Sequence, residues 1–275
     1  MEDLTGKVAV VTGAASGIGR SLALSFGRQG MRVVIADVSD QGLADTEELL
    51  SRDGVRSIAQ VTDVSDADAV EALAARAFAE YGAVHVLCNN AGVSTIGKQW
   101  ELSLDDWTWV LGVDLWGPIH GVRAFLPRML SSGQPGHIIN TASMGGLMSG
   151  PLVGPYSVAK HGVVGLSKGL RIELHDKNIS VSVLCPGEVR TGIVPGMRQH
   201  IETTGTALSD DARQMIEFLD QSLNNSMSPE VVADMVLKAV ESNTFWVLPN
   251  SAHYGPVLSA EFDEMFNHIH ASTPQ

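Results

Sequence analysis

Short apolar runs alternate with longer segments whose apolar residues recur every three or four positions, and the alternation continues to about residue 248. The short runs predict β-strands and the longer segments predict amphipathic helices. The predicted strands are Lys7–Thr12, Arg32–Asp37, Ser57–Val64, Val84–Asn89, His137–Ala142, Ser180–Cys185 and Phe245–Leu248. The predicted helices are Gly17–Gln29, Gln41–Arg52, Asp66–Tyr81, Leu104–Leu130, Tyr156–His175 and Pro229–Glu241. This order predicts an α/β fold of stacked βαβ units around a parallel sheet.

One domain is expected for the whole chain, residues 1–275, because no linker, internal repeat or low-complexity tract divides it. Asp66 is a predicted helix N-cap, and Gly30 and Gly82 are predicted helix ends. A segment of about 192–227 has no strong strand pattern. An extension of about 250–275 follows the last strand, and its apolar residues at roughly helical spacing are Tyr254, Phe262, Met265 and Phe266.

Composition excludes several classes of protein. The formal net charge is -13 and only 18% of the residues are charged, so neither nucleic acid nor an anionic membrane surface is an expected partner. No apolar run is long enough to span a membrane and no leader precedes the first strand, which predicts a cytoplasmic protein. Cys88 and Cys185 lie in apolar runs and are predicted to be buried thiols. No HExxH or CxxC pattern occurs, so no metal is expected.

Tyr156 and Lys160 are four positions apart and share one face of a predicted helix. A free phenol has a pKa near ~10, so it needs roughly 4 kcal/mol of stabilisation as phenolate to act as a base at neutral pH. An ammonium at about 4 Å supplies an interaction of that size when the effective dielectric constant is near ~20. The pair therefore predicts a general base poised near pH 7, unless the two residues simply share a solvated helix face.

A glycine-rich turn, Thr12–Gly19, joins the first strand to the first helix. Glycines there allow a tight turn and let a pyrophosphate approach the helix N-terminus. The spacing is GxxxGxG, which meets the dinucleotide fingerprint only loosely, and a plain strand-to-helix connection is the alternative.

Asp37 ends the second strand 24 residues after Gly13, where an acidic residue meets the ribose hydroxyls of an adenine dinucleotide. A carboxylate within about 4 Å of a 2′-phosphate would repel it by roughly 4 kcal/mol per unit charge. Neither Val38 nor Ser39 is basic, so NAD is predicted in preference to NADP. The alternative for Asp37 is a cap on the next helix.

Three further strand ends carry polar residues. Asp63 either faces the adenine or takes part in capping the helix that begins near Asp66. The stretch Asn89–Gly92 either borders the cofactor and braces neighbouring strands or forms a plain turn. Ser143 stands thirteen residues before Tyr156, where its hydroxyl either hydrogen-bonds a substrate oxygen or simply ends a strand.

Taken together, TGAASGIG at 12–19, NNAG at 89–92, Ser143, YSVAK at 156–160 and PGEVRT at 186–191 resemble the short-chain dehydrogenase/reductase family. The resemblance covers roughly Lys7 to Pro249. It implies a single-domain Rossmann-like fold with seven parallel strands, assembled into dimers or tetramers through the two long helices near Leu104–Leu130 and Tyr156–His175.

The same resemblance implies residue roles. Tyr156 is the acid/base, Ser143 orients the substrate oxygen, and Lys160 holds the nicotinamide ribose and lowers the pKa of the phenol. The implied cofactor-binding residues are Gly13, Ser16, Gly17, Ile18, Gly19, Asp37, Asp63, Val64, Asn90, Ala91, Gly92, Tyr156, Lys160, Pro186, Gly187, Val189 and Thr191.

One position departs from the family pattern. Asp114 stands in a VDLWG context where the family usually carries Asn, which is thought to support a water that links the lysine to solvent. Asp114 still accepts a hydrogen bond. An ionised carboxylate would also stabilise the Lys160 ammonium and oppose the phenolate, which shifts the expected pH optimum upward.

Apolar and Met side chains predict a hydrophobic substrate pocket. The lid, about 192–227, and the turn after Ser143 supply most of the expected contacts: Met144, Leu147, Met148, Glu188, Ile193 and Met197. Core or subunit contacts are the alternative for the apolar residues, and a solvated loop charge is the alternative for Glu188.

The expected activity is NAD-dependent interconversion of a hydrophobic secondary alcohol and its ketone. Reduction of 3-oxoacyl thioesters and oxidation of a sugar or polyol remain open within enzymes. A catalytically silent dinucleotide sensor or scaffold is the alternative from another class, against which the intact Ser143, Tyr156 and Lys160 set argues.

Overall fold

Seven parallel strands form one sheet in the order β3-β2-β1-β4-β5-β6-β7 in the computed structural model, which describes residues 1 and 3–271. The strands are β1 Val8–Thr12, β2 Arg32–Asp37, β3 Ser57–Val61, β4 Val86–Asn89, β5 Gly136–Thr141, β6 Ile179–Leu184 and β7 Trp246–Val247. All seven predicted strands are confirmed. The strand order reverses between β1 and β4, and the crevice for a ligand in such a sheet lies at the carboxyl ends of the strands.

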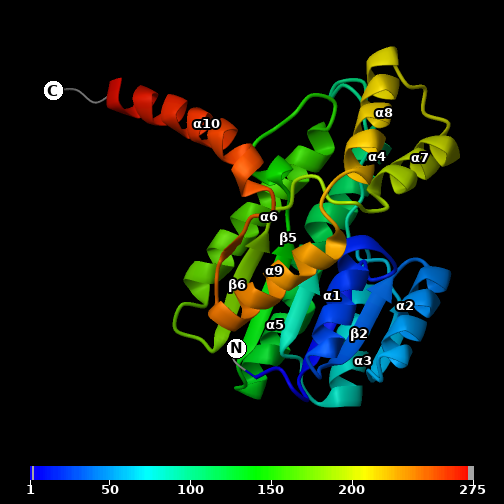
Figure 1. Cartoon of the computed structure of the whole chain (residues 1–275), viewed down its shortest axis with the longest axis vertical. Helices are drawn as coiled ribbons and strands as arrows, with labels where there is room; N and C mark the ends of the chain where they lie inside the picture. Colours follow the sequence, from blue (N-terminus) through cyan, green and yellow to red (C-terminus); the bar gives the residue numbers. More distant parts are fainter. Residues whose placement is uncertain (2, 272–275) are drawn as a thin grey trace.

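Helices cover both faces of the sheet (Figure 1). Their bounds are α1 Gly17–Arg28, α2 Asp40–Arg52, α3 Ala67–Tyr81, α4 Leu104–Leu111, α5 Gly117–Ser132, α6 Gly154–Glu173, α7 Ile193–Thr204, α8 Asp210–Asn224, α9 Pro229–Ser242 and α10 Ser251–Ala271. Helices α3, α5 and α6 pack on one face, and α1, α2 and α9 pack on the other.

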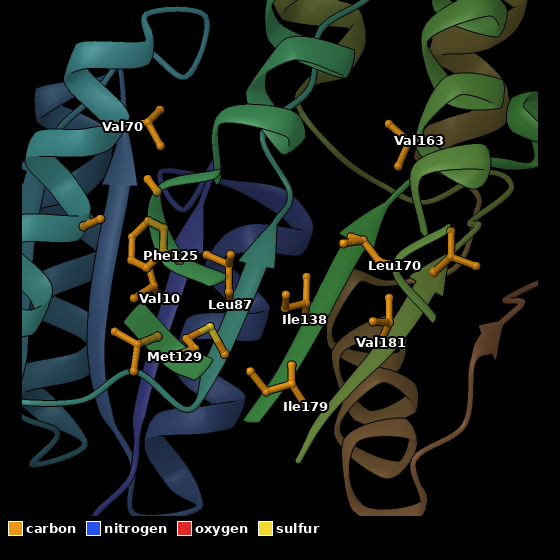
Figure 2. Close-up of a cluster of buried hydrophobic side chains, with 14 of the residues drawn as sticks. Val10, Val70, Leu87, Phe125, Met129, Ile138, Val163, Leu170, Ile179 and Val181 are labelled. Atoms are coloured by element: carbon orange, nitrogen blue, oxygen red, sulfur yellow. The ribbon is translucent and has the colours of Figure 1, made fainter. Parts of the chain in front are cut away.

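Successive residues of a strand point to opposite faces, and here both faces are buried. Val10 of β1 lies near Phe125 in the buried cluster beneath α3, α5 and α6, which also contains Leu170 of α6 (Figure 2). Its neighbour Val11 packs with Leu22 of α1 on the other face. Burial on both faces explains why the strands are continuous apolar runs, as expected for a parallel sheet.

The helix predicted over Leu104–Leu130 is interrupted. A wide π-helical turn, Gly112–Trp116, separates α4 from α5. The sequence carries glycines where α5 approaches the sheet: a Cβ at Gly121 would lie 2.0 Å from the side-chain oxygen of Asn89. The predicted helical pattern over Leu104–Leu130 is confirmed, and the difference is the π-helical turn within it, which carries Asp114.

The lid, residues 192–227, contains the helices α7 and α8. The sequence had indicated only that this segment lacks a strand pattern, and these two helices were not predicted. Apolar residues of both helices form a small separate cluster with Ile96: Val194, Met197, Ala212 and Ile216. Ser209 caps α8 by accepting the N–H of Ala212.

The extension after β7 is one long helix, α10, which begins at Ser251 and projects away from the rest of the protein (Figure 1). Residues 272–275 of the predicted extension and the side chain of Met265 lie outside the described residues. Within residues 1 and 3–271, no helix has the length and apolar character needed to cross a membrane.

Candidate active site

The turn between β1 and α1 cannot accept side chains at its glycines. Gly13 and Gly17 have φ of 67° and 52°, in the left-handed region. A Cβ at Gly19 would lie 2.0 Å from the carbonyl oxygen of Gly13. Ser16, the N-cap of α1, makes no side-chain capping bond, so the first N–H groups of the helix are not capped by it. This is the arrangement that binds a phosphate group.

Asp37 lies beside this turn. Its carboxylate accepts the backbone N–H of Ala15 at 3.0 Å and that of Ser39 at 3.0 Å. Ser39, whose hydroxyl accepts the N–H of Gly42, is the N-cap of α2. The alternative that Asp37 itself caps α2 is therefore wrong. The side chain of Arg20 is bonded to Thr46 and to the backbone of this turn.

Asn90 braces the carboxyl ends of three neighbouring strands. Its side chain donates to the carbonyl oxygen of Thr12 at 3.0 Å and accepts the hydroxyl of Thr141 at 3.2 Å. The N–H groups of Asn90 and Ala91 both donate to the Thr12 hydroxyl. The strand-bracing role considered for this stretch is confirmed. These hydrogen bonds hold Thr12, Asn90 and Thr141 together. The strand ends, with the buried side chains bonded to them, are called the floor of the site below.

The third strand end is less constrained. The Asp63 carboxylate accepts the N–H and the hydroxyl of Ser65, at 2.9 and 2.7 Å. Asp66, not Asp63, is the N-cap of α3, where it accepts the N–H groups of Asp68 and Ala69. Asp63 therefore shapes the turn before that cap. Val64 is buried.

Tyr156 and Lys160 lie on the first turns of α6, and Ser143 follows β5. The ammonium of Lys160 donates to the carbonyl oxygen of Thr141 at 3.1 Å and lies 5.5 Å from the centre of the Tyr156 ring. The Ser143 hydroxyl accepts the N–H of Gly145 at 3.0 Å, and Gly145 packs against the same tyrosine ring. The structure thus brings the three predicted side chains together at the carboxyl ends of the strands.

Asp114 joins this group from the π-helical turn. One carboxylate oxygen lies 3.1 Å from the Lys160 ammonium, and the other accepts the N–H of Val93 at 2.7 Å. Both charged side chains are almost completely buried, with exposed fractions of 0% and 3%. Gly92 leaves room for this pair, because a Cβ there would lie 3.3 Å from the ammonium.

The pKa of the Tyr156 phenol is raised above its ordinary value. Burial is the largest cause, and the Asp114 carboxylate adds to it. The Lys160 ammonium and a hydrogen bond with Ser143 lower the pKa, but by less. The expectation of a phenol poised near pH 7 was wrong because it counted the cation and omitted desolvation.

The Asp114–Lys160 pair holds its protons more strongly than either group would in water. Burial raises the pKa of Asp114 by more than Lys160 and the Val93 N–H lower it. For Lys160, burial lowers the pKa, and Asp114 together with Tyr156 more than reverses that effect. The lysine is therefore a cation at neutral pH, and within the pair it is the Asp114 carboxylate that opposes loss of a proton from the phenol.

The segment Pro186–Thr191 contacts Ser143 at one end and the glycine turn at the other. The Pro186 carbonyl oxygen accepts the Ser143 hydroxyl at 3.3 Å and the N–H of Met144 at 2.8 Å. Thr191 packs against Gly17, with its Cβ 3.2 Å from where a Cβ of the glycine would stand. Thr191 therefore lies at the N-terminus of α1. Val189 between them is buried.

Sequence reasoning missed a contact between this segment and α10. The hydroxyl of Tyr254 donates to the Glu188 carboxylate at 2.6 Å. Its ring also packs so closely on Gly187 that a Cβ there would lie 2.4 Å from a ring carbon. Burial and the neighbouring carboxylate raise the pKa of this phenol. Nothing in the local pattern signalled a partner 66 positions away.

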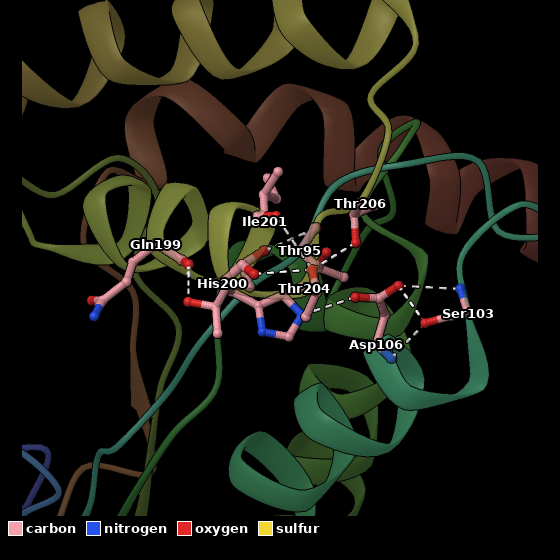
Figure 3. Close-up of polar contacts among 10 residues, drawn as sticks. Thr95, Ser103, Asp106, Gln199, His200, Ile201, Thr204 and Thr206 are labelled. Carbon is pink, nitrogen blue, oxygen red and sulfur yellow. Dashed lines mark hydrogen bonds and ion pairs between the residues drawn. The ribbon is translucent and has the colours of Figure 1, made fainter.

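Another contact that the sequence did not indicate attaches helix α7 of the lid to helix α4 (Figure 3). His200 of α7 lies 2.8 Å from the carboxylate of Asp106, whose other oxygen accepts the Ser103 hydroxyl at 2.7 Å. The Trp109 ring stacks on the imidazole, with centres 3.7 Å apart. Asp106 thus both completes the capping box of α4 and holds the end of α7.

The predicted substrate residues are divided between two apolar clusters. Met197 is buried in the lid cluster, and Ile193 packs at its edge. Met144 is buried in the main core, against which Leu147 and Met148 pack while partly buried. Their predicted contact with a substrate stays a prediction.

The two cysteines, Cys88 and Cys185, are buried free thiols, as predicted. Within residues 1 and 3–271, no group of three or more His, Cys, Asp or Glu side chains is arranged to hold a metal ion.

Comparison with known proteins gives close relatives over nearly the whole chain. The chain is 36% identical over 263 residues to a 1-deoxy-11-beta-hydroxypentalenate dehydrogenase from Streptomyces avermitilis, covering 95% of this chain and 90% of the relative. It is 35% identical over 250 residues to a C alpha-dehydrogenase from a Sphingobium species, covering 90% of this chain and 82% of that one.

A solved structure has the same fold. It is a short-chain dehydrogenase/reductase from Burkholderia phymatum in complex with NAD, with a TM-score of 0.93 and 36% identity, and the match covers 100% of this chain and 99% of that chain. The sequence model described as short chain dehydrogenase matches residues 7–202. With this match, the seven-stranded parallel sheet and the Ser143, Tyr156 and Lys160 constellation, the chain belongs to the short-chain dehydrogenase family.

Proposed function

We propose that the protein is an NAD-dependent oxidoreductase that interconverts a hydrophobic secondary alcohol and its ketone, with Tyr156 as general acid/base. The observation that carries the proposal is the meeting of Ser143, Tyr156 and Lys160 beside the glycine turn, at the carboxyl ends of the strands. The relatives named as a 1-deoxy-11-beta-hydroxypentalenate dehydrogenase and a C alpha-dehydrogenase support the reaction class.

The residues fit a nicotinamide dinucleotide. The cradle at Gly13, Gly17 and Gly19 has no space for side chains, so a pyrophosphate can approach the backbone at the N-terminus of α1. Asp37 would take the adenosine ribose, Lys160 the nicotinamide ribose, and Thr191 the carboxamide. Among the other predicted cofactor residues, Asp63 and Val64 follow β3, Asn90–Gly92 follow β4, and Pro186–Thr191 follow β6.

NAD is proposed over NADP because of the charges around Asp37. Its carboxylate would repel a 2′-phosphate. Arg20, a cation near the same turn, is bonded to Thr46 and to the backbone carbonyl oxygen of Ala15. The NAD in the Burkholderia structure is consistent with this choice.

The proton chemistry follows from the geometry. In ketone reduction, the Tyr156 hydroxyl donates its proton to the substrate oxygen, and the Ser143 hydroxyl holds that oxygen in place. The raised pKa of Tyr156 keeps this proton on the phenol at neutral pH. In alcohol oxidation the proton moves the other way, and the Lys160 ammonium stabilises the phenolate. When bound, the nicotinamide supplies the two-electron exchange with the substrate carbon.

A hydrophobic substrate is proposed because apolar side chains follow the catalytic serine and occur in the lid. Met144, Leu147 and Met148 follow the catalytic serine, and the lid adds Ile193 and Met197. Such walls favour a bulky hydrophobic alcohol or ketone over a sugar.

We also propose that the protein is a homodimer or homotetramer. Exposed apolar side chains stand on the two helices expected at subunit contacts, including Leu130 of α5 and Val158 and Ile172 of α6. Surfaces of this kind are typical of protein contacts.

The proposal is tested by following NADH absorbance with a panel of hydrophobic secondary alcohols and ketones. The parent should turn over at least one of them, and faster with NAD than with NADP. Tyr156→Phe should lose about 10²- to 10⁴-fold in kcat, the range for a positioned acid/base, while it still binds NAD. Tyr81→Phe, on the distant helix α3, is the matched control and should keep full turnover.

Undiminished turnover in Tyr156→Phe would overturn the assignment of the acid/base. Binding of NAD without turnover of any panel member would favour the dinucleotide sensor instead.

A further inference from the structure

Helix α10 has an apolar stripe that this chain does not cover. Its first turns are anchored, because Tyr254 and Leu258 pack against the main core. Beyond them the helix projects away from the rest of the protein (Figure 1). Phe262 and Phe266 are about half exposed, at 49% and 51%, and with Leu258 they recur every four residues on one side of the helix.

The stripe is bordered by negative charge. Glu261, Asp263 and Glu264 are exposed carboxylates, and 251–271 contains no Lys or Arg. Helical spacing places Glu261 along one side of the stripe and Asp263 along the other, with Glu264 on the opposite face of the helix. An acidic helix of this kind suits a surface that combines apolar area with cations, and it is repelled by anionic lipid.

A groove with that complementary character lies on α6 and β7. It is lined by Lys168, Arg171, Ile172, His175, Phe245 and Trp246 and has a volume of about 640 Å³. Ile172 is 72% exposed, which is high for such a large apolar side chain. Lys168 and Arg171 lie over the rings of Trp246 and Phe245, at 5.5 and 4.7 Å, so the cations and the apolar surface form one site.

The two surfaces lie at opposite ends of the same edge strand. Phe245 precedes β7, whereas α10 begins four residues after Val247. β7 is the last strand of the sheet, and its outer edge is unpaired within the described chain. A two-fold axis beside this edge and perpendicular to β7 would make the two β7 strands antiparallel and bring the start of each α10 toward the groove of the other copy. Each α10 is about 31 Å long, enough to cross a groove formed by side chains of two elements.

We propose that α10 of one chain docks in the Lys168–Trp246 groove of a second copy, with Phe262 and Phe266 against Ile172 and the carboxylates of α10 against Lys168 and Arg171. The contact rests on the proposed self-association and assigns a specific surface to it. The contact would also link the subunit interface to the active-site crevice, because Tyr254 in the first turn of α10 donates a hydrogen bond to Glu188.

Cross-linking between two separately purified variants tests the contact directly. The Phe266→Cys chain is mixed with the Ile172→Cys chain under mild oxidation, and a disulfide-linked dimer is expected that neither variant forms alone. The native cysteines do not compete, because both are buried. The matched control pairs Phe266→Cys with Phe218→Cys, whose site on α8 is equally accessible at 64% exposure, and it should stay unlinked.

Charge reversal gives an independent measurement by sedimentation equilibrium of the full chain. Glu261→Lys with Asp263→Lys should weaken association at least about 10-fold, the change that corresponds to 1.4 kcal/mol. Adding Lys168→Glu and Arg171→Glu to the same chain should restore most of it.

A dimer that neither cross-links nor responds to charge reversal would overturn the docking of α10 and leave the proposed self-association standing. A monomeric parent at every concentration would overturn both. Flotation of the monomeric chain with lipid vesicles, lost in Phe262→Ser, would assign α10 to a membrane surface and overturn the proposal as well.

Discussion

The floor and the lid of the candidate active site are held in different ways. On the floor, Lys160 and Asp114 are buried and bonded to each other and to the backbone of neighbouring strands and loops. The lid helices α7 and α8 instead have a small apolar cluster of their own, and α7 is tied to α4 by the His200–Asp106 pair.

Under the proposed function, the floor would carry out the proton transfer and the lid would select the substrate. Side chains that move a proton need fixed distances, and the floor draws its rigidity from the sheet itself. A lid that rests on a small cluster and a few polar contacts opens at a lower free-energy cost, as substrate entry requires. Substitutions should therefore affect global stability on the floor and local opening in the lid.

The largest expected effect comes from Lys160→Met on the floor. It leaves the Asp114 carboxylate buried without its cation, which should lower the free energy of unfolding by about 3–5 kcal/mol at neutral pH. Because burial already raises the pKa of Asp114, that group can take up a proton inside the fold. In denaturant titrations the loss should therefore shrink as the pH is lowered through the raised pKa of the buried carboxyl.

Lys160→Met combined with Asp114→Leu should recover much of this stability, since an apolar pair replaces the broken ion pair. A single Lys160→Met chain as stable as the parent at every pH would show that the floor is no more constrained than the lid.

A smaller and local effect is expected from Asp106→Asn in the lid. The pKa of Asp106 is lowered, because hydrogen bonds from Ser103 and His200 outweigh the burial that raises it. Its contribution is therefore present above the ordinary pKa of 3.8 and is lost as the pH falls through the lower folded-state value. The substitution should make opening of α7 easier by about 1.5–3 kcal/mol, measured by hydrogen exchange.

The comparison is sharpened by Arg198→Ala, which removes an exposed ion pair with Asp220 inside the same lid. Exposed pairs contribute at most about 1 kcal/mol, so exchange in α7 should barely change. Equal effects of the two substitutions would mean that His200–Asp106 does not anchor the lid.

The effect most specific to chemistry is expected from Asp114→Asn. The carboxylate raises the pKa of Tyr156, so its removal should lower that pKa. The acid limb of the pH profile for alcohol oxidation should then move to lower pH, with Asp105→Asn on the surface of α4 as the unshifted control. Identical profiles for the parent and Asp114→Asn would refute an electrostatic role for this residue.

Most of the sheet could be predicted from sequence because its strands are buried on both faces and so form continuous apolar runs. The lid could not be predicted from strand patterns, although Ser209 followed by Asp210 and Asp211 is a helix-start signal that indicates α8. The break between α4 and α5 has no such signal, since Gly112–Trp116 differs from ordinary helix only in how the backbone is wound.

In the site, local spacing was enough to pair Tyr156 with Lys160. Contacts that cross the fold were out of reach: His200 and Asp106 are 94 positions apart, and neither lies in a motif. The sign of the Tyr156 pKa shift was also out of reach, because desolvation depends on how completely the folded chain covers the phenol.

The wide helical turn at Gly112–Trp116 has a consequence for how this region can vary. Removing or inserting one residue there would rotate everything beyond it by about 100°, the angle per residue of a helix with 3.6 residues per turn. Asp114 would then face away from the ammonium, whatever amino acids were chosen. Segment length in this stretch is thus under as tight a constraint as residue identity, whereas exposed loops tolerate indels.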